Sequence, residues 1–156
     1  MSALGPKMTG LAGEIADGVL FNWFTTEFER QSGELVTAAA SQAGRPQPLI
    51  MSYVRCGLLP HAQHRLQERA ARYANIPQYA RHFARMGISA HETCVSGTDA
   101  ATLQTGIAAH EQVLDETIVR AITPDDRAAS ILELLRACAP TLRQHRVGDM
   151  DSNPHG

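Results

Sequence analysis

The sequence predicts an α/β protein built from parallel β/α units. Helix and strand signals alternate through the first third of the 156 residues, and the loops between them are short. The first strand signal is a continuous apolar run at residues 19–21, which is typical of a strand that is buried on both faces. With 44% apolar and 19% charged residues, the chain has the composition of one globular domain.

The chain begins with a helix signal. Pro6 suits the first turn of a helix, because the N–H group that proline lacks would have no partner there. Apolar side chains then recur at helical spacing and predict one buried stripe, made of Met8, Leu11, Ala12 and Ile15. The pair Asp17–Gly18 ends this helix and leads into the apolar strand.

A second helix and strand follow. Thr26 and Glu29 have the spacing of a capping box, which predicts a helix start. The buried face of this helix is expected at Phe28, Leu35 and Ala39. Gly44 can end the helix, and the β-branched and aromatic residues that come next predict a strand over Leu49–Arg55.

The rest of the chain is predicted to be mainly helical. One helix is expected over residues 61–75, and a second begins at Pro77 and ends near Gly87. Residues 99–119 are also expected to be helical. The hydroxyl, proline and carboxylates of Thr123–Asp126 predict the start of a last helix. The core side of that helix is expected at Ala128, Ile131, Leu132, Leu135 and Cys138.

Charge and composition argue against several classes of function. The formal net charge is −2, so no cationic field favours nucleic acid or an anionic membrane. No apolar run approaches the roughly 20 residues of a membrane-spanning helix, and no secretory signal is recognised. The three cysteines are expected to be reduced thiols in a cytoplasmic protein. His61 and His64 lack a third ligand at a recognisable spacing, so no metal is expected.

Two kinds of position carry candidate chemistry. The turn at Gly5–Pro6 opens a helix whose free backbone N–H groups and dipole form an anion site, to which Lys7 can add a charge. A helix start without a ligand explains the same residues. Asn22 and Arg55 lie at the carboxyl ends of predicted strands, where Arg55 can hold a phosphate or a carboxylate. A polar loop residue and a surface arginine are the alternative interpretations of these two positions.

The stretch "ALGPKMTGLAGEIADGVLFN", residues 3–22, resembles the luciferase-like family of flavin- or deazaflavin-dependent oxidoreductases. Three weaker matches follow in the family's order: "PLIMSYVRC", "RYANIPQYARHFARMG" and "ITPDDRAASILELL". The resemblance covers roughly residues 2–138. It implies a partial, helix-rich TIM (β/α)8 barrel, the C-terminal half, over residues 1–140. The polar residues 141–156 are expected to form a disordered tail.

The resemblance also implies a cofactor and a substrate class. Relatives use coenzyme F-420 or a flavin such as FMN for hydride transfer or monooxygenation of a small organic substrate. In the family the Gly-Pro-Lys-Met turn contacts the phosphate-bearing tail of the coenzyme, which assigns cofactor binding to Leu4, Gly5, Lys7 and Met8. Asn22 lines the substrate or cofactor cleft in relatives, and Arg55, on the same side by topology, is also assigned to substrate binding. Within this resemblance, the Gly-Pro-Lys-Met sequence of the turn favours F-420 over FMN.

Barrels of this family run to roughly 250 residues or more, so the resemblance places residue 2 near the end of about the fifth strand. The first half of the barrel, with most of the ring pocket and the catalytic groups, would then lie outside these residues. Three interpretations stay open. The first is a truncated oxidoreductase, the second is a non-catalytic half-barrel that works as an assembly or binding module, and the third is an inactive gene fragment. Open strand edges would favour a homo-oligomer or pairing with the missing half-barrel.

Overall fold

The computed structural model describes residues 1–140, which contain one sheet of four strands. The strands are β1 (Gly18–Asn22), β2 (Leu49–Leu58), β3 (Val95–Gly97) and β4 (Glu116–Ala121). β2 is central and pairs with the other three, and every pairing is parallel. Ser2 forms a parallel bridge to Leu20, so the first residues of the chain run alongside β1. The predicted α/β class with parallel strands is confirmed.

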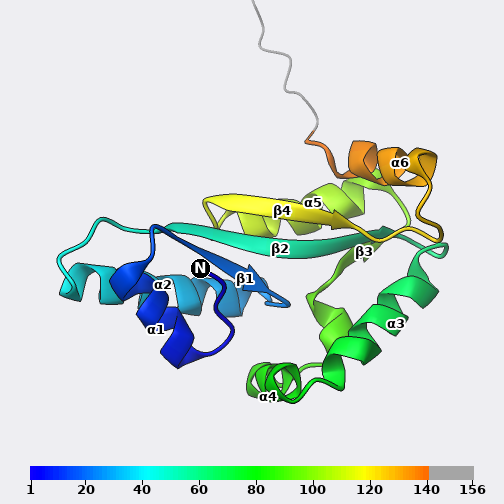
Figure 1. The fold of residues 1–156 in the computed structure, drawn as a ribbon. Helices are drawn as coiled ribbons and strands as arrows, with labels where there is room; N and C mark the ends of the chain where they lie inside the picture. The colour runs from blue at the N-terminus through cyan, green and yellow to red at the C-terminus, as the bar shows by residue number, and fades with distance from the viewer. Residues whose placement is uncertain (141–156) are drawn as a thin grey trace, which may run out of the picture.

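Between residues 1 and 140, six α-helices and one short 3-10 helix accompany the sheet. The α-helices are α1 (Pro6–Ile15), α2 (Thr26–Gln42), α3 (Gln63–Ala74), α4 (Pro77–Met86), α5 (Ala100–Glu111) and α6 (Ala128–Cys138). The 3-10 helix spans Ala90–Thr93. Figure 1 shows α3 and α4 extending away from the sheet at the carboxyl end of β2.

Helices cover one face of the sheet through two buried clusters. The first cluster joins β1 to α1 and α2, and its members include Val19, Phe21, Ala12 and Val36. The second joins β2 to α5 and α6, and its members include Val54, Cys56, Leu103 and Leu134. Burial of these apolar side chains is the main force that holds the helices on the sheet.

The opposite face of the sheet carries a different set of side chains, because side chains alternate along a strand. Cross-strand neighbours form three rows on this face: Leu20, Met51 and Glu116; Asn22, Tyr53 and Ile118; and Arg55 with Arg120. The first row lies toward the amino ends of the strands and the third toward their carboxyl ends. In a closed (β/α)8 barrel, this face is the inside.

Most predicted elements of the first ninety residues are present. The predicted helix, strand, helix and strand correspond to α1, β1, α2 and β2, and the two predicted helices of the middle region correspond to α3 and α4. Gly44 and Gly87 follow α2 and α4 with φ angles of 67° and 69°. This is the left-handed region that glycine adopts at helix ends, so both predicted helix stops are confirmed.

The prediction for the last third is partly wrong. The helix expected over residues 99–119 ends at Glu111, and β4 follows it. β3 is not indicated by the sequence analysis either. The last helix begins at Ala128 rather than at Thr123, because the Thr123 hydroxyl donates a hydrogen bond to the Asp125 carbonyl oxygen and closes a turn before the helix.

The predicted buried stripes of α1, α2 and α6 are wrong in several positions. The members that are exposed are Met8, Leu11, Ile15, Leu35, Ala128, Leu132 and Leu135. α1 packs on α2 through Gly13, and α6 faces the core through Leu134 and Cys138. The apolar spacing is helical in each case, but another side of the helix meets its neighbour.

The start of α2 differs from the predicted capping box. Thr25, not Thr26, is the N-cap residue, and its hydroxyl oxygen accepts a hydrogen bond from the backbone N–H of Phe28 at 3.3 Å. Glu29 is fully buried, and its carboxylate is hydrogen-bonded to His110 Nδ1 of α5 at 2.7 Å. Glu29 therefore joins two helices instead of capping one.

Three further expectations concern the chain as a whole. The tail predicted over residues 141–156 lies outside the described residues. None of the helices in residues 1–140 combines the length and the apolar character needed to cross a bilayer. Cys56, Cys94 and Cys138 are free thiols.

Candidate functional site

The carboxyl ends of β1 and β2 bring polar and aromatic side chains together. Asn22 ends β1, and its Oδ1 accepts a hydrogen bond from Arg55 Nη1 at 2.8 Å. Its Nδ2 donates to the hydroxyl oxygen of Tyr79, on α4, at 3.0 Å. The two positions predicted for substrate binding are therefore in direct contact. They lie at the end of the sheet where barrel enzymes place their functional groups.

Arg55 is buried among aromatic rings, with only 5% of its surface exposed. Its guanidinium carbon lies 3.6 Å from the ring centroid of Trp23 and 5.1 Å from that of Tyr73. Burial lowers the pKa of Arg55, and nearby Tyr73 and Cys94 partly oppose that shift. No carboxylate of residues 1–140 forms an ion pair with it. The interpretation as a surface arginine is wrong, whereas binding of a phosphate or carboxylate stays a prediction.

Trp23 follows β1 in a backbone conformation that side chains rarely adopt. Its φ angle is 63°, in the left-handed region. Its carbonyl oxygen lies 2.8 Å from His82 Nε2, and its buried indole N–H has no hydrogen-bond partner among the described residues. Such strained residues persist where their surroundings fix them, and they cluster at ligand sites. The conformation of Trp23 thus supports a functional role for this corner.

His82 connects Trp23 to the turn before α1. Its Nε2 donates to the Trp23 carbonyl oxygen, which leaves Nδ1 to accept a hydrogen bond from Arg85 Nη2 at 3.2 Å. The same nitrogen of Arg85 donates to the Leu4 carbonyl oxygen at 3.0 Å. Burial lowers the pKa of His82, and the charge of Arg85 lowers it further. The imidazole is therefore neutral at pH 7 and holds the guanidinium beside the turn.

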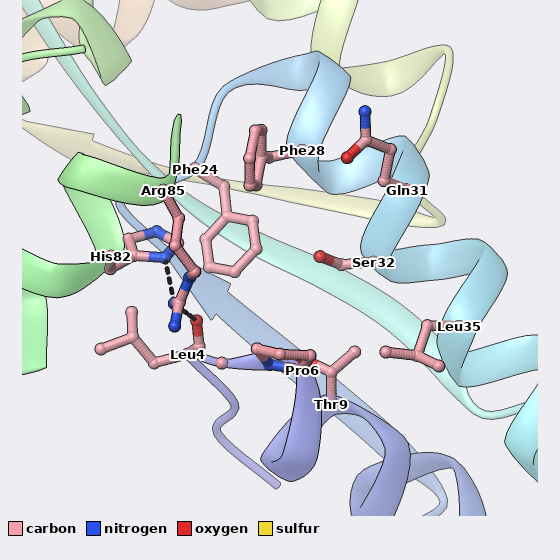
Figure 2. Close-up of a pocket in the computed structure, with 11 residues that line it drawn as sticks. Leu4, Pro6, Thr9, Phe24, Phe28, Gln31, Ser32, Leu35, His82 and Arg85 are labelled. Atoms are coloured by element: carbon pink, nitrogen blue, oxygen red, sulfur yellow. Dashed lines mark hydrogen bonds between the residues drawn. The ribbon is translucent and has the colours of Figure 1, made fainter. Parts of the chain in front are cut away.

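A cavity of about 250 Å³ opens between α1, α2 and α4. Figure 2 shows residues that line it, among them Leu4, Thr9, Phe24, Gln31 and Arg85. Two of the four residues predicted to bind the cofactor, Leu4 and Gly5, line this cavity. The other two, Lys7 and Met8, are exposed and do not line it.

The hydrogen-bond donors around this cavity favour an anion. Gly5 is the N-cap of α1, and no side chain caps the helix, so N–H groups of its first turn are free for a ligand. The helix dipole adds partial positive charge there, and Arg85 adds a full charge. A Cβ atom on Gly5 would lie 3.3 Å from Arg85 Nη1, so glycine lets the guanidinium approach the backbone. A phosphate or a carboxylate suits this set of donors.

His82 and Arg85 are not among the site residues predicted from the sequence. They lie three residues apart on α4 and therefore share one side of the helix, which is the signal that could have found them. Tyr79, on the same helix, joins the site through the hydrogen bond that its half-buried hydroxyl accepts from Asn22. Within the described residues, no three histidine, cysteine, aspartate or glutamate side chains are grouped so that they could hold a metal ion.

Lowering the pH is expected to destabilise the protein through His82. The unfolded state binds a proton at the ordinary histidine pKa of about 6.5, whereas the folded state resists it, so stability is lost as pH falls through that value. Protonation of Nδ1 would also remove the acceptor that Arg85 uses. Urea unfolding at pH values on either side of about 6.5 measures this effect. The loss should be smaller in His82→Gln, and an equal loss in both proteins would contradict the assignment.

Parallel β/α units, with an uncapped helix start and a polar cluster at the carboxyl ends of the strands, are typical of part of a (β/α)8 barrel. The chain belongs to the luciferase-like monooxygenase family, whose model matches residues 1–141. The resemblance stated from the sequence is thereby confirmed. Among curated proteins, none matches the sequence.

Solved structures of similar fold include three oxidoreductases. An F-420-dependent secondary alcohol dehydrogenase, in complex with an F-420–acetone adduct, gives a TM-score of 0.62 at 14% identity over 89% of this chain and 48% of that chain. The coenzyme F-420-dependent tetrahydromethanopterin reductase of Methanopyrus kandleri gives 0.58 at 18% identity over 86% and 48%. The oxygenating constituent of 3,6-diketocamphane monooxygenase from Pseudomonas putida, in complex with FMN, gives 0.59 at 13% identity over 87% and 44%.

These matches establish the fold and its extent. The chain spans less than half the length of each of the three structures. The predicted partial TIM barrel is therefore confirmed. At identities below 20%, the likeness carries the fold and not the activity.

Proposed function

We propose that this chain provides part of the cofactor and substrate site of an oxidoreductase that uses coenzyme F-420, or alternatively FMN, and acts on a small organic substrate. The observation that carries the proposal is the cavity at the Gly5 turn, where the uncapped start of α1 and the guanidinium of Arg85 face the same space. Membership of the luciferase-like family supports it, as do the F-420 and FMN complexes among proteins of similar fold.

The residues present fit the anionic tail of such a cofactor. The free N–H groups, the helix dipole and Arg85 all favour a phosphate. Ligand pockets commonly measure about 300–1,000 Å³, so a cavity of about 250 Å³ suits one part of the cofactor and not all of it. The Gly-Pro-Lys-Met turn supports F-420 over FMN through the family resemblance alone.

In this proposal, residues near the cavity position Arg85 and attract the ligand. His82 and the Leu4 carbonyl oxygen fix Arg85, so that the charge is in place before the ligand binds. Lys7, exposed beside the turn, adds long-range attraction for an anion. When bound, the cofactor supplies the redox chemistry, by hydride transfer or by oxygen activation. The protein contributes binding, orientation and electrostatics.

Asn22 and Arg55 are proposed to orient the substrate at the carboxyl ends of the strands. Arg55 holds the Asn22 carbonyl oxygen, and Tyr79 accepts from the Asn22 amide nitrogen, so the amide cannot rotate freely. Because Arg55 lacks a carboxylate partner within residues 1–140, its charge is available to an anionic group of a substrate.

Titrations of the full chain with F-420 and with FMN, each followed by fluorescence, test the proposal. F-420 is expected to bind more tightly than FMN. Arg85→Ala should weaken binding about tenfold or more, because a hydrogen bond to a charged group contributes about 1.5–3 kcal/mol. Arg81→Ala is the matched control, since Arg81 is exposed on the same helix and does not line the cavity. Failure of the folded chain to bind either ligand, or equal loss in both variants, would contradict the proposal.

A further inference from the structure

Exposed apolar side chains gather on one flank of α1. Met8, Leu11 and Ile15 lie on the same side of this helix, and Ile15 is 60% exposed. The helix meets α2 through Gly13, where an added Cβ would lie 2.4 Å from the Val36 carbonyl oxygen. The apolar flank therefore faces away from α2, and its three side chains are exposed.

α6 has a matching flank at the other end of the chain. Ile131, Leu132 and Leu135 share one side of this helix, and Leu132 is 49% exposed. The opposite side meets α5, where Gln104 donates to the Ala137 carbonyl oxygen. The flank of α6 thus faces away from α5, as that of α1 faces away from α2.

The strands that lie beneath these two helices each have an outer edge that no described strand pairs with. β4 pairs with β2 and with no other strand of the described residues, and the segment around Ser2 bridges only to β1. The outer edge of β4, and the much shorter one at Ser2, therefore present backbone groups that pair with no described strand, which favours pairing with another chain. Between them, the face that carries Leu20, Met51 and Ile118 belongs to neither buried cluster of the sheet.

We propose that two copies of this chain associate about a twofold axis parallel to the strands. In this arrangement β4 of one copy lies beside the first residues of the other, and the α6 flank of one copy packs on the α1 flank of the other. The inner faces of the two sheets meet around the axis. One closed arrangement thus covers both flanks, both strand edges and the inner face.

Strand number and charge favour this occupant. The segment at Ser2, β1, β2 and β4 give four adjacent strand positions, so two copies supply the eight of a barrel. Parallel packing of α6 on α1 brings Arg136, near the end of α6, to the level of Glu14, near the end of α1. Neither residue has an ion-pair partner within residues 1–140. Antiparallel packing would set Arg136 near Lys7, which has the same charge.

Light scattering after size-exclusion chromatography tests the proposal on the full chain without cofactor. The mass is expected to be twice the 16.9 kDa of one chain. Leu11→Glu and Leu135→Glu should each reduce the measured mass to that of one chain, because each places a charge between the packed apolar flanks of α1 and α6. Leu35→Glu is the matched control and should leave the dimer intact, since Leu35 is exposed to 37%, as Leu11 is, but lies on neither flank.

A charge-swapped variant separates this arrangement from other dimers. Leu11→Lys combined with Leu135→Glu places opposite charges where the α1 flank of one copy meets the α6 flank of the other. The fraction of dimer should therefore be higher than for Leu135→Glu alone. Circular dichroism verifies that each variant is folded. A monomeric parent chain would overturn the proposal. So would a dimer that survives both single substitutions, or one that is sensitive to Leu135→Glu but not to Leu11→Glu. The result does not depend on cofactor binding, so the proposed function is tested separately.

Discussion

His110→Leu is expected to lower the free energy of unfolding by about 3–5 kcal/mol, the largest effect of any single substitution considered for this protein. His110 Nδ1 lies 2.7 Å from Glu29 Oε2, and both side chains are buried. The other carboxylate oxygen, Oε1, is buried with no hydrogen-bond partner among the described residues. Removing the imidazole would leave the whole carboxylate of Glu29 without a partner.

The double variant Glu29→Met with His110→Leu is the control for this prediction. It removes both polar groups and fills their space with apolar atoms, so much of the lost stability should return. Urea unfolding followed by circular dichroism gives all three free energies. A loss within about 0.5 kcal/mol for His110→Leu, the range of ordinary surface substitutions, would show that the pair does not hold α2 to α5.

Gly13→Ala is expected to destabilise the protein by about 1–3 kcal/mol or more, because it overpacks the contact between α1 and α2. An added Cβ would lie 2.4 Å from the Val36 carbonyl oxygen and 2.8 Å from the Ala39 Cβ. Neither can move without shifting the backbone of α2. Because α1 also carries the turn at Gly5, the same substitution should weaken cofactor binding.

Gly10→Ala is the matched control on the same helix. Nothing lies within 4 Å of a Cβ at Gly10. The substitution should leave stability unchanged or raise it by up to about 1 kcal/mol, since alanine favours a helix more than glycine does. Thermal unfolding of both variants compares the two sites. If Gly13→Ala is as stable as Gly10→Ala, the close approach of α1 and α2 is wrong.

The elements that the sequence predicts well are those with a strong local signal. β1 is a continuous apolar run between a helix and a capped helix, so its position follows from the chain itself. β4 is different, because Glu116 and Arg120 make it look like a polar continuation of α5. Its strand character comes from pairing with β2. In this pairing Glu116 lies beside Met51, which is 65 residues earlier in the sequence. Such long-range pairing is not visible in local spacing.

The errors in burial have a common physical origin. The stripes on α1 and α6 have helical spacing, yet Leu11 and Leu135 are exposed. Spacing identifies an apolar side of a helix but not which neighbour covers it. In the proposed dimer these flanks are covered by the second copy, which would explain why apolar side chains occur there.

The candidate site shows the same division between local and long-range information. Asn22 and Arg55 are predictable because a polar residue that follows the apolar part of a strand is itself a signal, although β2 continues to Leu58 and not only to Arg55. His82 and Arg85 reach the Leu4 turn only because α4 docks beside it, some eighty residues later in the sequence. That docking depends on tertiary packing. The sequence therefore predicts Asn22 and Arg55, whereas the position of His82 and Arg85 beside the turn is known only from the fold.

The most direct test of a cofactor site at the Gly5 turn is an NMR titration of the isotope-labelled chain with F-420, followed through its backbone amide signals. The largest shifts are expected at the first turn of α1, over residues 7–9, and at Arg85, which lines the same cavity. Asp17 and Arg45, at the amino end of the sheet, should shift little. Shifts that are absent from the first turn of α1, or that are strongest near Asp17, would contradict the site.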